Sequence, residues 1–434
     1  MTKILAAIAF KIRLYFKKTV HFINRVPVEF WFIFVVIFAI GIRFVFPIKL
    51  AYWDDFDYSR IAKTIEEGRF LPQNYKNWFA HRYPVVYPVA FAIKFLGTSE
   101  WALLSWPFFC SIASVIFTFI AARELFGKMA AFWAGLLMAI HPMEVKLASV
   151  LLPAPVFNFL ILGGITFWIL GEKYRPHYPH RLFRFFLPDI GKRDIELKTN
   201  PFAIYRYGLW FFFWFLAGAF WVSTYYLRPY GLLIFMVPAM YMAIRWIIKW
   251  EYIWLPVLAV IFFLIIEVLI RGMTKEWFFN YSFLQWFMDK DMYPIGNVTE
   301  HLDFYRNLLF SDRLLNMFTI LLLVLIGIYF KDYKSLIRKQ KAALWIPLIM
   351  FMLLFGYLEF GVFSIEHLSF LFKEDRYIGV INPAVCMILG LVFSRKTPDT
   401  SAPFVIAGLI FLAVVWISAA GWPQGLIEIW ETLK

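Results

Sequence analysis

Long apolar runs, separated by short charged segments, recur along almost the whole of this chain. A bilayer core about 30 Å thick is crossed by roughly 20 apolar helical residues, because a helix rises about 1.5 Å per residue. About eleven runs come near this length, at residues 29–48, 101–122, 129–147, 155–171, 208–226, 229–245, 252–270, 314–330, 342–363, 377–393 and 403–421. The pattern predicts an all-α, multi-pass protein surrounded by membrane lipids.

The composition supports a membrane protein and excludes other classes. Of 434 residues, 62% are hydrophobic and 17% are charged, whereas soluble domains are about half apolar and about a quarter charged. The 52 phenylalanines and 19 tryptophans exclude a disordered chain. Cys110 and Cys386 both lie within apolar runs, so they predict neither a disulfide framework nor a zinc site.

The distribution of lysine and arginine predicts the orientation of the spans. Cytoplasmic loops carry an excess of these residues, and here they gather at 1–28, 172–207 and 331–341. With the N-terminus inside, the main outer segments are 49–100, 271–313 and 364–376. If the apolar segment 84–97 crossed alone, the basic loops would lie outside, so we predict that it does not cross by itself.

The same pattern divides the chain into three parts. We expect a cytoplasmic amphipathic segment at 1–28, a transmembrane domain at 29–421 and a short C-terminal tail at 422–434. No small-residue cleavage site precedes the first span, so we expect no signal peptide. The net charge of +14 lies in short loops rather than in a basic stripe with exposed aromatics, which argues against nucleic acid as a partner.

Carboxylates gather in the first outer loop, directly after the first predicted span. Asp54 and Asp55 are adjacent and are followed by Asp57 and Tyr58. A carboxylate at the membrane boundary can act as a general base for a hydroxyl group, or can bind a metal ion. The pair can instead cap a short surface helix, which the apolar spacing after Asp57 predicts. Both interpretations stay open from these residues alone.

Other polar residues mark further outer helix ends. His81 and Arg82 precede a proline-bounded turn, Arg228 lies in a tight turn between two spans, and Arg376 begins a late span. Since guanidinium groups offer forked donors, the three arginines could converge on a phosphate or pyrophosphate. Each could equally extend to lipid headgroups at its own helix end. Glu144 lies at a further outer helix end.

In their order along the chain, these segments resemble the GT-C superfamily of polytopic glycosyltransferases, in particular its protein mannosyltransferase and lipid A aminoarabinose transferase branch. Residues 53–58 (WDDFDY) are similar to its Asp-Glu-x-x-Tyr motif, with Asp55 in place of Glu. The segments 81–88, 121–142, 227–231 and 375–383 are similar to its R-P-P-L-Y-P, l-f-G…A…P, L-T-R-P-E-G and R-Y-l-l-P segments. The resemblance is firm over 50–240 and thinner afterwards.

The resemblance implies an enzyme that transfers a sugar from a polyprenyl- or dolichyl-phosphate donor to a lipid, glycan or protein acceptor, with inversion. Transfer would take place on the outer face of a bacterial or archaeal membrane. Asp54 or Asp55 would bind or deprotonate the acceptor hydroxyl, and Arg82 or Arg228 would bind the lipid phosphate. The remaining residues of the predicted substrate-binding site are Tyr58, His81, Glu144 and Arg376.

The chain departs from the family pattern at one position. Many relatives carry a second Asp at the outer end of the fourth span, where this chain has LLPAP at 151–155. Either Glu144 replaces that acid, or one acid suffices, or the acceptor differs. No cofactor is assigned by the resemblance, and a divalent cation at the carboxylates stays open. The oligosaccharyltransferase motif W-W-D-Y-G is absent, so transfer of a preassembled oligosaccharide to asparagine is not expected.

Two other functions stay open. A polysaccharide polymerase or O-antigen-type ligase would share the spans and outer arginines, but it would not need Asp54 and Asp55. A transporter or flippase for lipid-linked substrates should show paired repeats with broken helices near the midplane, and we find no such repeats in the sequence. Glu267 and Glu359, which lie within predicted spans, are the features that favour transport.

Overall fold

The computed structural model describes residues 26–46, 53–70, 78–175, 201–245, 253–274, 314–329, 336, 338–360, 362–364, 369–370 and 379–396. The helices are α2 (Val28–Val45), α3 (Trp53–Glu66), α4 (Tyr83–Leu96), α5 (Glu100–Phe126), α6 (Lys128–Ile140), α7 (Pro142–Leu147), α8 (Pro153–Tyr174), α10 (Pro201–Tyr225), α11 (Met236–Ile244), α12 (Trp254–Thr274), α15 (Leu314–Tyr329), α16 (Arg338–Phe360) and α17 (Asn382–Lys396). Two 3₁₀ helices, η2 (Trp78–His81) and η4 (Pro229–Phe235), precede α4 and α11.

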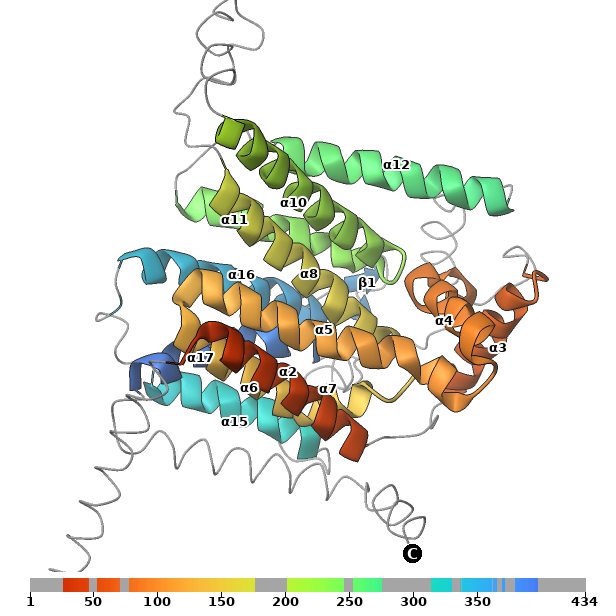
Figure 1. The fold of residues 1–434 in the computed structure, drawn as a ribbon, viewed down its shortest axis with the longest axis horizontal. Coiled ribbons are helices and arrows are strands. Elements are labelled where there is room, and N and C mark those ends of the chain that lie inside the picture. Colours follow the sequence, from red (N-terminus) through yellow and green to blue (C-terminus); the bar gives the residue numbers. More distant parts are fainter. Residues whose placement is uncertain are drawn as a thin grey trace, which may run out of the picture.

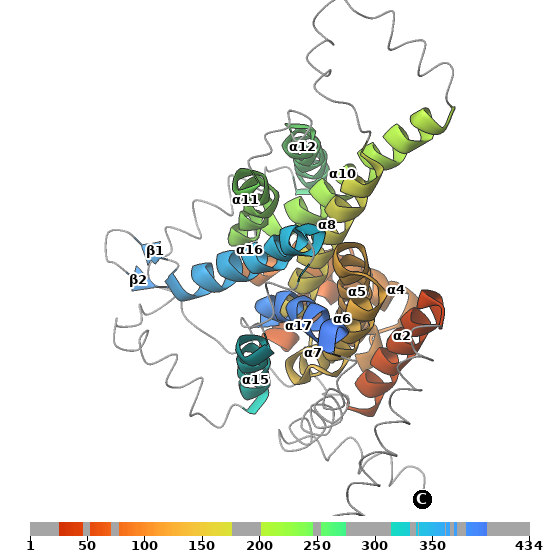
Figure 2. The same cartoon turned by 90° about the vertical axis from the view of Figure 1, so that its left-hand side faces the viewer.

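The long helices lie side by side and form one bundle (Figure 1). Along the bundle axis, α10, α11 and α12 lie on one side and α2, α6 and α15 on the other (Figure 2). A short antiparallel pair, β1 (Val362–Ser364) with β2 (Ser369–Phe370), follows α16. The sequence did not predict these two strands, which fall at the border between the last residues of a predicted span and the outer loop 364–376.

Six described helices are long and apolar enough to cross a membrane, namely α2, α5, α8, α10, α12 and α16. The predicted all-α, multi-pass membrane fold is therefore confirmed. α4, α6 and the segments Gly231–Ile244 and Gly379–Arg395 are apolar but shorter. The predicted span 403–421, the tail 422–434 and residues 1–25 of the amphipathic segment lie outside the described residues.

Two predicted spans are interrupted. Within 129–147, α6 ends at Ile140 and α7 begins at Pro142. Proline restricts the residue before it to extended backbone, and His141 accordingly has ψ 118°. Within 229–245, Pro229 begins a 3₁₀ helix before α11. Pro142 therefore explains the break between α6 and α7, because a proline restricts the residue before it and lacks the N–H of a helix interior. Pro229 begins its segment, so it does not explain the 3₁₀ geometry that follows.

Small residues allow the centre of the bundle to pack closely. α8 packs against α5 and α10. A Cβ added at Gly163, Gly164 or Gly171 of α8 would overlap the rings of Phe220, Trp221 or Trp214 of α10, respectively. Close helix packing through glycine is typical of membrane proteins, in which apolar burial does not itself drive helices together.

α3 and α4 lie together at one end of the bundle, at the right of Figure 1, which we call the α3–α4 end. The surface helix expected after Asp57 is α3, and it begins earlier, at Trp53. Asp54 and Asp55 therefore lie inside its first turn rather than before it, so they are not its capping residues. The segment 84–97 forms α4 beside α3, and the expectation that it does not cross alone stays a prediction.

Candidate functional site

The start of α4 is joined to α3 by a buried polar contact. One Nη of Arg82 donates a hydrogen bond to the hydroxyl of Tyr58. The guanidinium carbon also lies 5.7 Å from the centre of the Tyr58 ring and 5.6 Å from that of Phe79. Tyr58 is completely buried and Arg82 is 3% exposed. The hydrogen bond and the two rings together hold the guanidinium in one orientation.

Three other charged side chains lie close enough to Tyr58 to shift the pKa of its hydroxyl group. The pKa of Tyr58 is raised to about 12, chiefly by burial. The positive charges of Arg82 and Arg228 oppose this rise, and the carboxylate of Asp54 adds to it. Side chains from α3, from the residue before α4 and from the turn after α10 are thus within electrostatic reach of one hydroxyl group. We call Asp54, Tyr58, Arg82 and Arg228 the arginine–tyrosine cluster.

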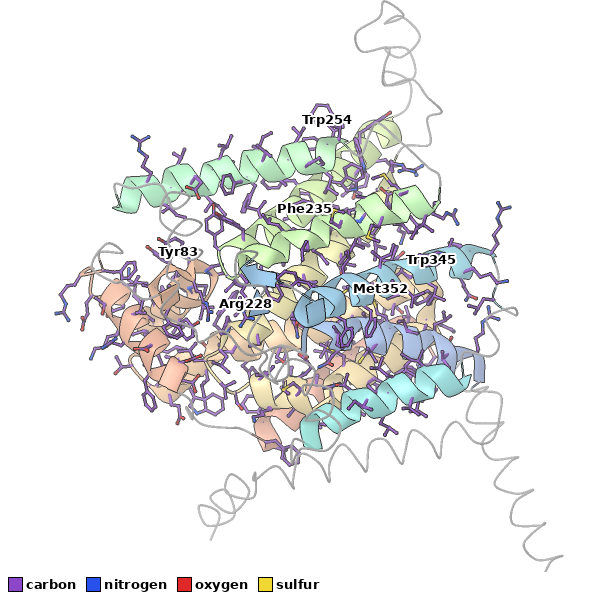
Figure 3. The ribbon with its side chains drawn as sticks, turned by 180° about the vertical axis from the view of Figure 1, so that it is seen from behind. Tyr83, Arg228, Phe235, Trp254, Trp345 and Met352 are labelled. Atoms are coloured by element: carbon purple, nitrogen blue, oxygen red, sulfur yellow. The ribbon has the colours of Figure 1, made fainter. Side chains whose placement is uncertain are left out.

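Arg228 is placed by a tightly packed turn. Its backbone N–H donates to the carbonyl of Thr224 at 2.8 Å, and its carbonyl accepts from Gly231 N–H at 2.8 Å. A Cβ at Gly231 would overlap the side chain of Thr224 and come within 2.9 Å of the Phe157 ring. Only glycine fits there, so the turn has little freedom. Seen from behind, Arg228 and Tyr83 lie toward the α3–α4 end (Figure 3).

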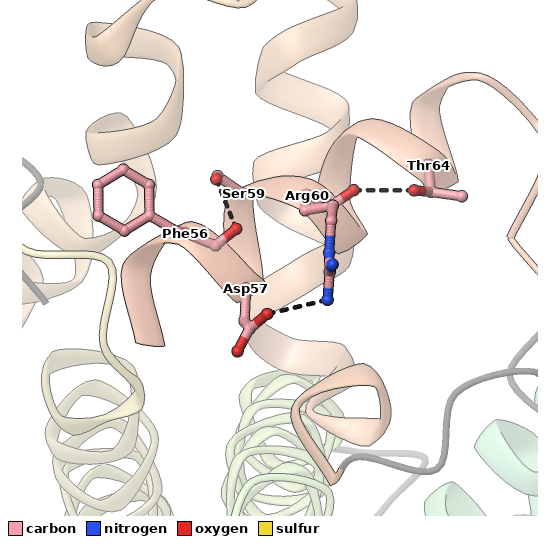
Figure 4. Close-up of polar contacts among 5 residues, drawn as sticks. All are labelled: Phe56, Asp57, Ser59, Arg60 and Thr64. Atoms are coloured by element: carbon pink, nitrogen blue, oxygen red, sulfur yellow. Dashed lines mark hydrogen bonds and ion pairs between the residues drawn. The ribbon is translucent and has the colours of Figure 1, made fainter. Parts of the chain in front are cut away.

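The carboxylates of α3 point in different directions. Asp55 is completely buried, and Asp54 is partly buried. Both lie in the first helical turn, where the helix dipole favours negative charge. Asp57 instead forms an ion pair with Arg60, with a Nη–Oδ1 distance of 3.0 Å, on an accessible face of the helix (Figure 4). Asp54 and Asp55 therefore differ from Asp57, which is engaged in an accessible ion pair. The sequence alone did not show this difference.

Glu144 lies in a second polar cluster. Its carboxylate accepts hydrogen bonds from the side-chain amides of Asn158 at 3.0 Å and Asn382 at 3.1 Å, and it is 1% exposed. Asn382 accepts a hydrogen bond from Thr319 at 3.1 Å, and Thr319 contacts His141 Nε2 at 3.0 Å. These contacts join α7, α8, α15 and α17. Whether Glu144 contacts a substrate stays a prediction.

Arg43 supplies positive charge close to Glu144. It donates to Ser111 at 2.9 Å and to the carbonyl of Ala139, in the last turn of α6, at 3.1 Å. Ser111 in turn donates to the backbone carbonyl of Glu144 at 3.2 Å. The sequence analysis did not single out Arg43, Asn158 or Asn382. The signal that could have found them is a polar residue isolated within an apolar run.

The remaining predicted residues are not tested by these contacts. His81 is the last residue of η2, directly before Arg82. Arg376 and the part of the outer segment 271–313 beyond Thr274 lie outside the described residues. Within the described ranges, no three His, Cys, Asp or Glu side chains gather as a metal site requires, so we assign the divalent cation no ligands there.

Comparison with known proteins supports the fold. No family model and no curated protein sequence matches the chain. ArnT from Cupriavidus metallidurans, in the apo state, is similar with a TM-score of 0.56 and 15% identity over 85% of this chain and 60% of that one. ArnT from the same organism, bound to undecaprenyl phosphate, has a TM-score of 0.54 and 14% identity, over 88% of this chain and 62% of that one.

A second similar structure is AglB, the oligosaccharyltransferase of Archaeoglobus fulgidus, in complex with an inhibitory peptide and a dolichol-phosphate. It has a TM-score of 0.51 and 14% identity over 90% of this chain and 56% of that one. This chain thus spans less than two thirds of the length of these neighbours. ArnT and AglB are both GT-C superfamily members, so the chain has a GT-C fold, as its ordered motifs predicted.

Proposed function

We propose that this protein is a membrane glycosyltransferase that takes a sugar from a polyprenyl-phosphate donor and transfers it, with inversion, to a lipid, glycan or protein acceptor outside the cytoplasm. The observation that carries this proposal is the arginine–tyrosine cluster, in which Asp54, Tyr58, Arg82 and Arg228 come together at one end of a membrane bundle. The fold supports it, and so do the two neighbours solved with undecaprenyl phosphate and dolichol-phosphate.

In this proposal Arg82 and Arg228 bind the phosphate of the donor. The prenyl chain must stay in the bilayer, so the phosphate has to be bound at the membrane boundary, where the α3–α4 end would lie. Two guanidinium groups stabilise the negative charge that builds up on the phosphate as the bond to the sugar breaks. The hydrogen bond to Tyr58 keeps Arg82 oriented before the donor arrives.

Asp54 is the base in this proposal. The acceptor hydroxyl oxygen attacks the anomeric carbon, the carbon–oxygen bond to the lipid phosphate breaks, and the hydroxyl proton goes to the carboxylate. Direct displacement inverts the configuration at that carbon. Asp54 is partly buried and close to Tyr58, whereas Asp55 is completely buried. An acceptor can reach Asp54 more readily, so we assign it the proton transfer and leave Asp55 a supporting role.

The test is sugar transfer by the full chain in detergent or membranes, using a panel of labelled polyprenyl-phosphate sugars. Wild type is compared with Asp54→Asn and Asp55→Asn, and Asp57→Asn serves as the matched control because Asp57 pairs with Arg60. We expect Asp54→Asn to lose about 100-fold or more of transfer while donor binding persists, and the control to keep its activity. Wild type inactive with every donor, or a fully active Asp54→Asn, would overturn the proposal.

A further inference from the structure

Another ionisable cluster includes tyrosines from the segments that carry the two arginines, and it has no part in the mechanism above. The hydroxyl of Tyr226 donates a hydrogen bond to Oε1 of Glu267 at 3.0 Å. The ring of Tyr83 lies 6.4 Å from that of Tyr226, and its hydroxyl is within electrostatic reach of Glu267. Tyr83 directly follows Arg82, and Tyr226 precedes Arg228 by two positions. The segments that carry the arginines therefore carry these tyrosines too.

Glu267 is unusual within its helix. α12 is otherwise strongly apolar, and its exposed residues include Val260, Leu264 and Val268, as expected of a face in contact with lipid. Glu267 is only 2% exposed, so it lies on the face turned toward the bundle. A carboxylate buried within a membrane helix is costly, and it usually marks a functional site when its partners face the protein interior.

We propose that Glu267, Tyr226 and Tyr83 form the subsite that recognises the hydroxyl groups of the donor sugar. This inference rests on the proposed function, because the sugar would be carried by the lipid phosphate that Arg82 and Arg228 bind. A sugar attached to that phosphate extends only a few ångströms from it. Tyr83 and Tyr226 adjoin the two arginines along the chain, and their rings lie 6.4 Å apart. Glu267 joins them through its hydrogen bond from Tyr226.

The chemistry of the three side chains fits a sugar. A carboxylate accepts up to about four hydrogen bonds, whereas the Tyr226 hydroxyl donates only one. Sugar hydroxyls are donors that a carboxylate can distinguish by position. Tyrosine rings offer flat apolar faces to the C–H groups of a sugar, together with a polar edge. Tyr83 is only partly buried, whereas Tyr226 and Glu267 are 3% and 2% exposed, so a sugar would approach the cluster from the side of Tyr83.

A purely structural role for Glu267 makes a different prediction. If the hydrogen bond to Tyr226 only fastens α12 to the bundle, then its loss lowers stability and total activity for every donor alike. If Glu267 binds sugar hydroxyl groups, its replacement also changes the ratio of activities between donors that differ in those hydroxyl groups. The ratio of kcat/KM values between a sugar and its deoxy analogue is therefore the decisive readout.

The experiment compares polyprenyl-phosphate mannose and glucose with their monodeoxy analogues. The variants are Glu267→Gln and Tyr226→Phe. Glu124→Gln is the matched control, because Glu124 forms an ion pair with Lys173, with a distance of 3.0 Å, at the C-terminal ends of α5 and α8. Competition by undecaprenyl phosphate, which carries no sugar, measures binding of the phosphate by itself.

For wild type and the control, removal of the recognised hydroxyl should lower kcat/KM by about 10- to 100-fold. In Glu267→Gln that ratio should fall toward one, with a smaller change in Tyr226→Phe and unchanged competition by undecaprenyl phosphate. An unchanged ratio in an active Glu267→Gln overturns the subsite but not the transfer reaction. Wild type that transfers no sugar from any donor overturns the proposed function and this inference with it.

Discussion

Replacing Asn158 with leucine tests the buried cluster around Glu144. Asn158 Nδ2 donates to Glu144 Oε1 at 3.0 Å, to Oε2 at 3.3 Å and to the carbonyl of Gly379 at 3.2 Å. Leucine has a similar volume but no donor, so the loss is electrostatic rather than a cavity. A hydrogen bond to a charged group contributes about 1.5–3 kcal/mol, and one to a neutral carbonyl about 1 kcal/mol. We therefore expect Asn158→Leu to lower the free energy of unfolding by about 2.5–4 kcal/mol.

Two cysteines supply the assay. Cys110 on α5 and Cys386 on α17 are both completely buried, so a thiol-reactive fluorescent dye labels them only as the bundle opens. Thr166→Val, on the same helix as Asn158, is the matched control. Thr166 donates one neutral hydrogen bond to the carbonyl of Phe117 at 3.1 Å, and its loss should cost about 1 kcal/mol.

The expected result is a labelling temperature that falls at least twice as far for Asn158→Leu as for Thr166→Val. Equal shifts, or no shift for Asn158→Leu, would refute the argument that Glu144 needs its amide donors in the folded state. Asn382→Leu, which removes the second amide at 3.1 Å, should resemble Asn158→Leu.

Three further predictions concern Tyr58 and the turn that carries Arg228. Tyr58→Phe removes the hydroxyl that accepts from Arg82 and should lower kcat/KM about 10-fold or more; activity equal to wild type would contradict an orienting role. Between pH 10 and about 12 folded Tyr58 keeps a proton that the unfolded chain has released, so stability falls as pH rises, and Tyr58→Phe should lose stability less steeply over that interval, as followed by thermal unfolding. Gly231→Ala places a Cβ against Thr224 and Phe157, so it should lower the labelling temperature and weaken donor binding, whereas Gly272→Ala, with nothing within 4 Å, should change neither.

The apolar runs were sufficient to predict an all-α, multi-pass membrane fold, because a bilayer leaves no water to satisfy backbone groups outside a helix. Among the described residues six helices are long and apolar enough to span, so the count of about eleven stays a prediction. Of the residues in the predicted site, Asp54, Arg82 and Arg228 lie within electrostatic reach of Tyr58, and the roles of all four stay predictions. The break at Pro142 was visible in the sequence, although the prediction of spans from apolar residues alone did not use it.

Only the tertiary structure decided how the polar residues group. Glu144 and Arg228 both lie at predicted outer helix ends, yet one joins Asn158 and Asn382 and the other joins Tyr58. Contacts such as His141 with Thr319 and Tyr226 with Glu267 join residues 178 and 41 positions apart. Local sequence determines whether a segment is helical, but the rotation and crossing of packed helices determine which side chains meet across them.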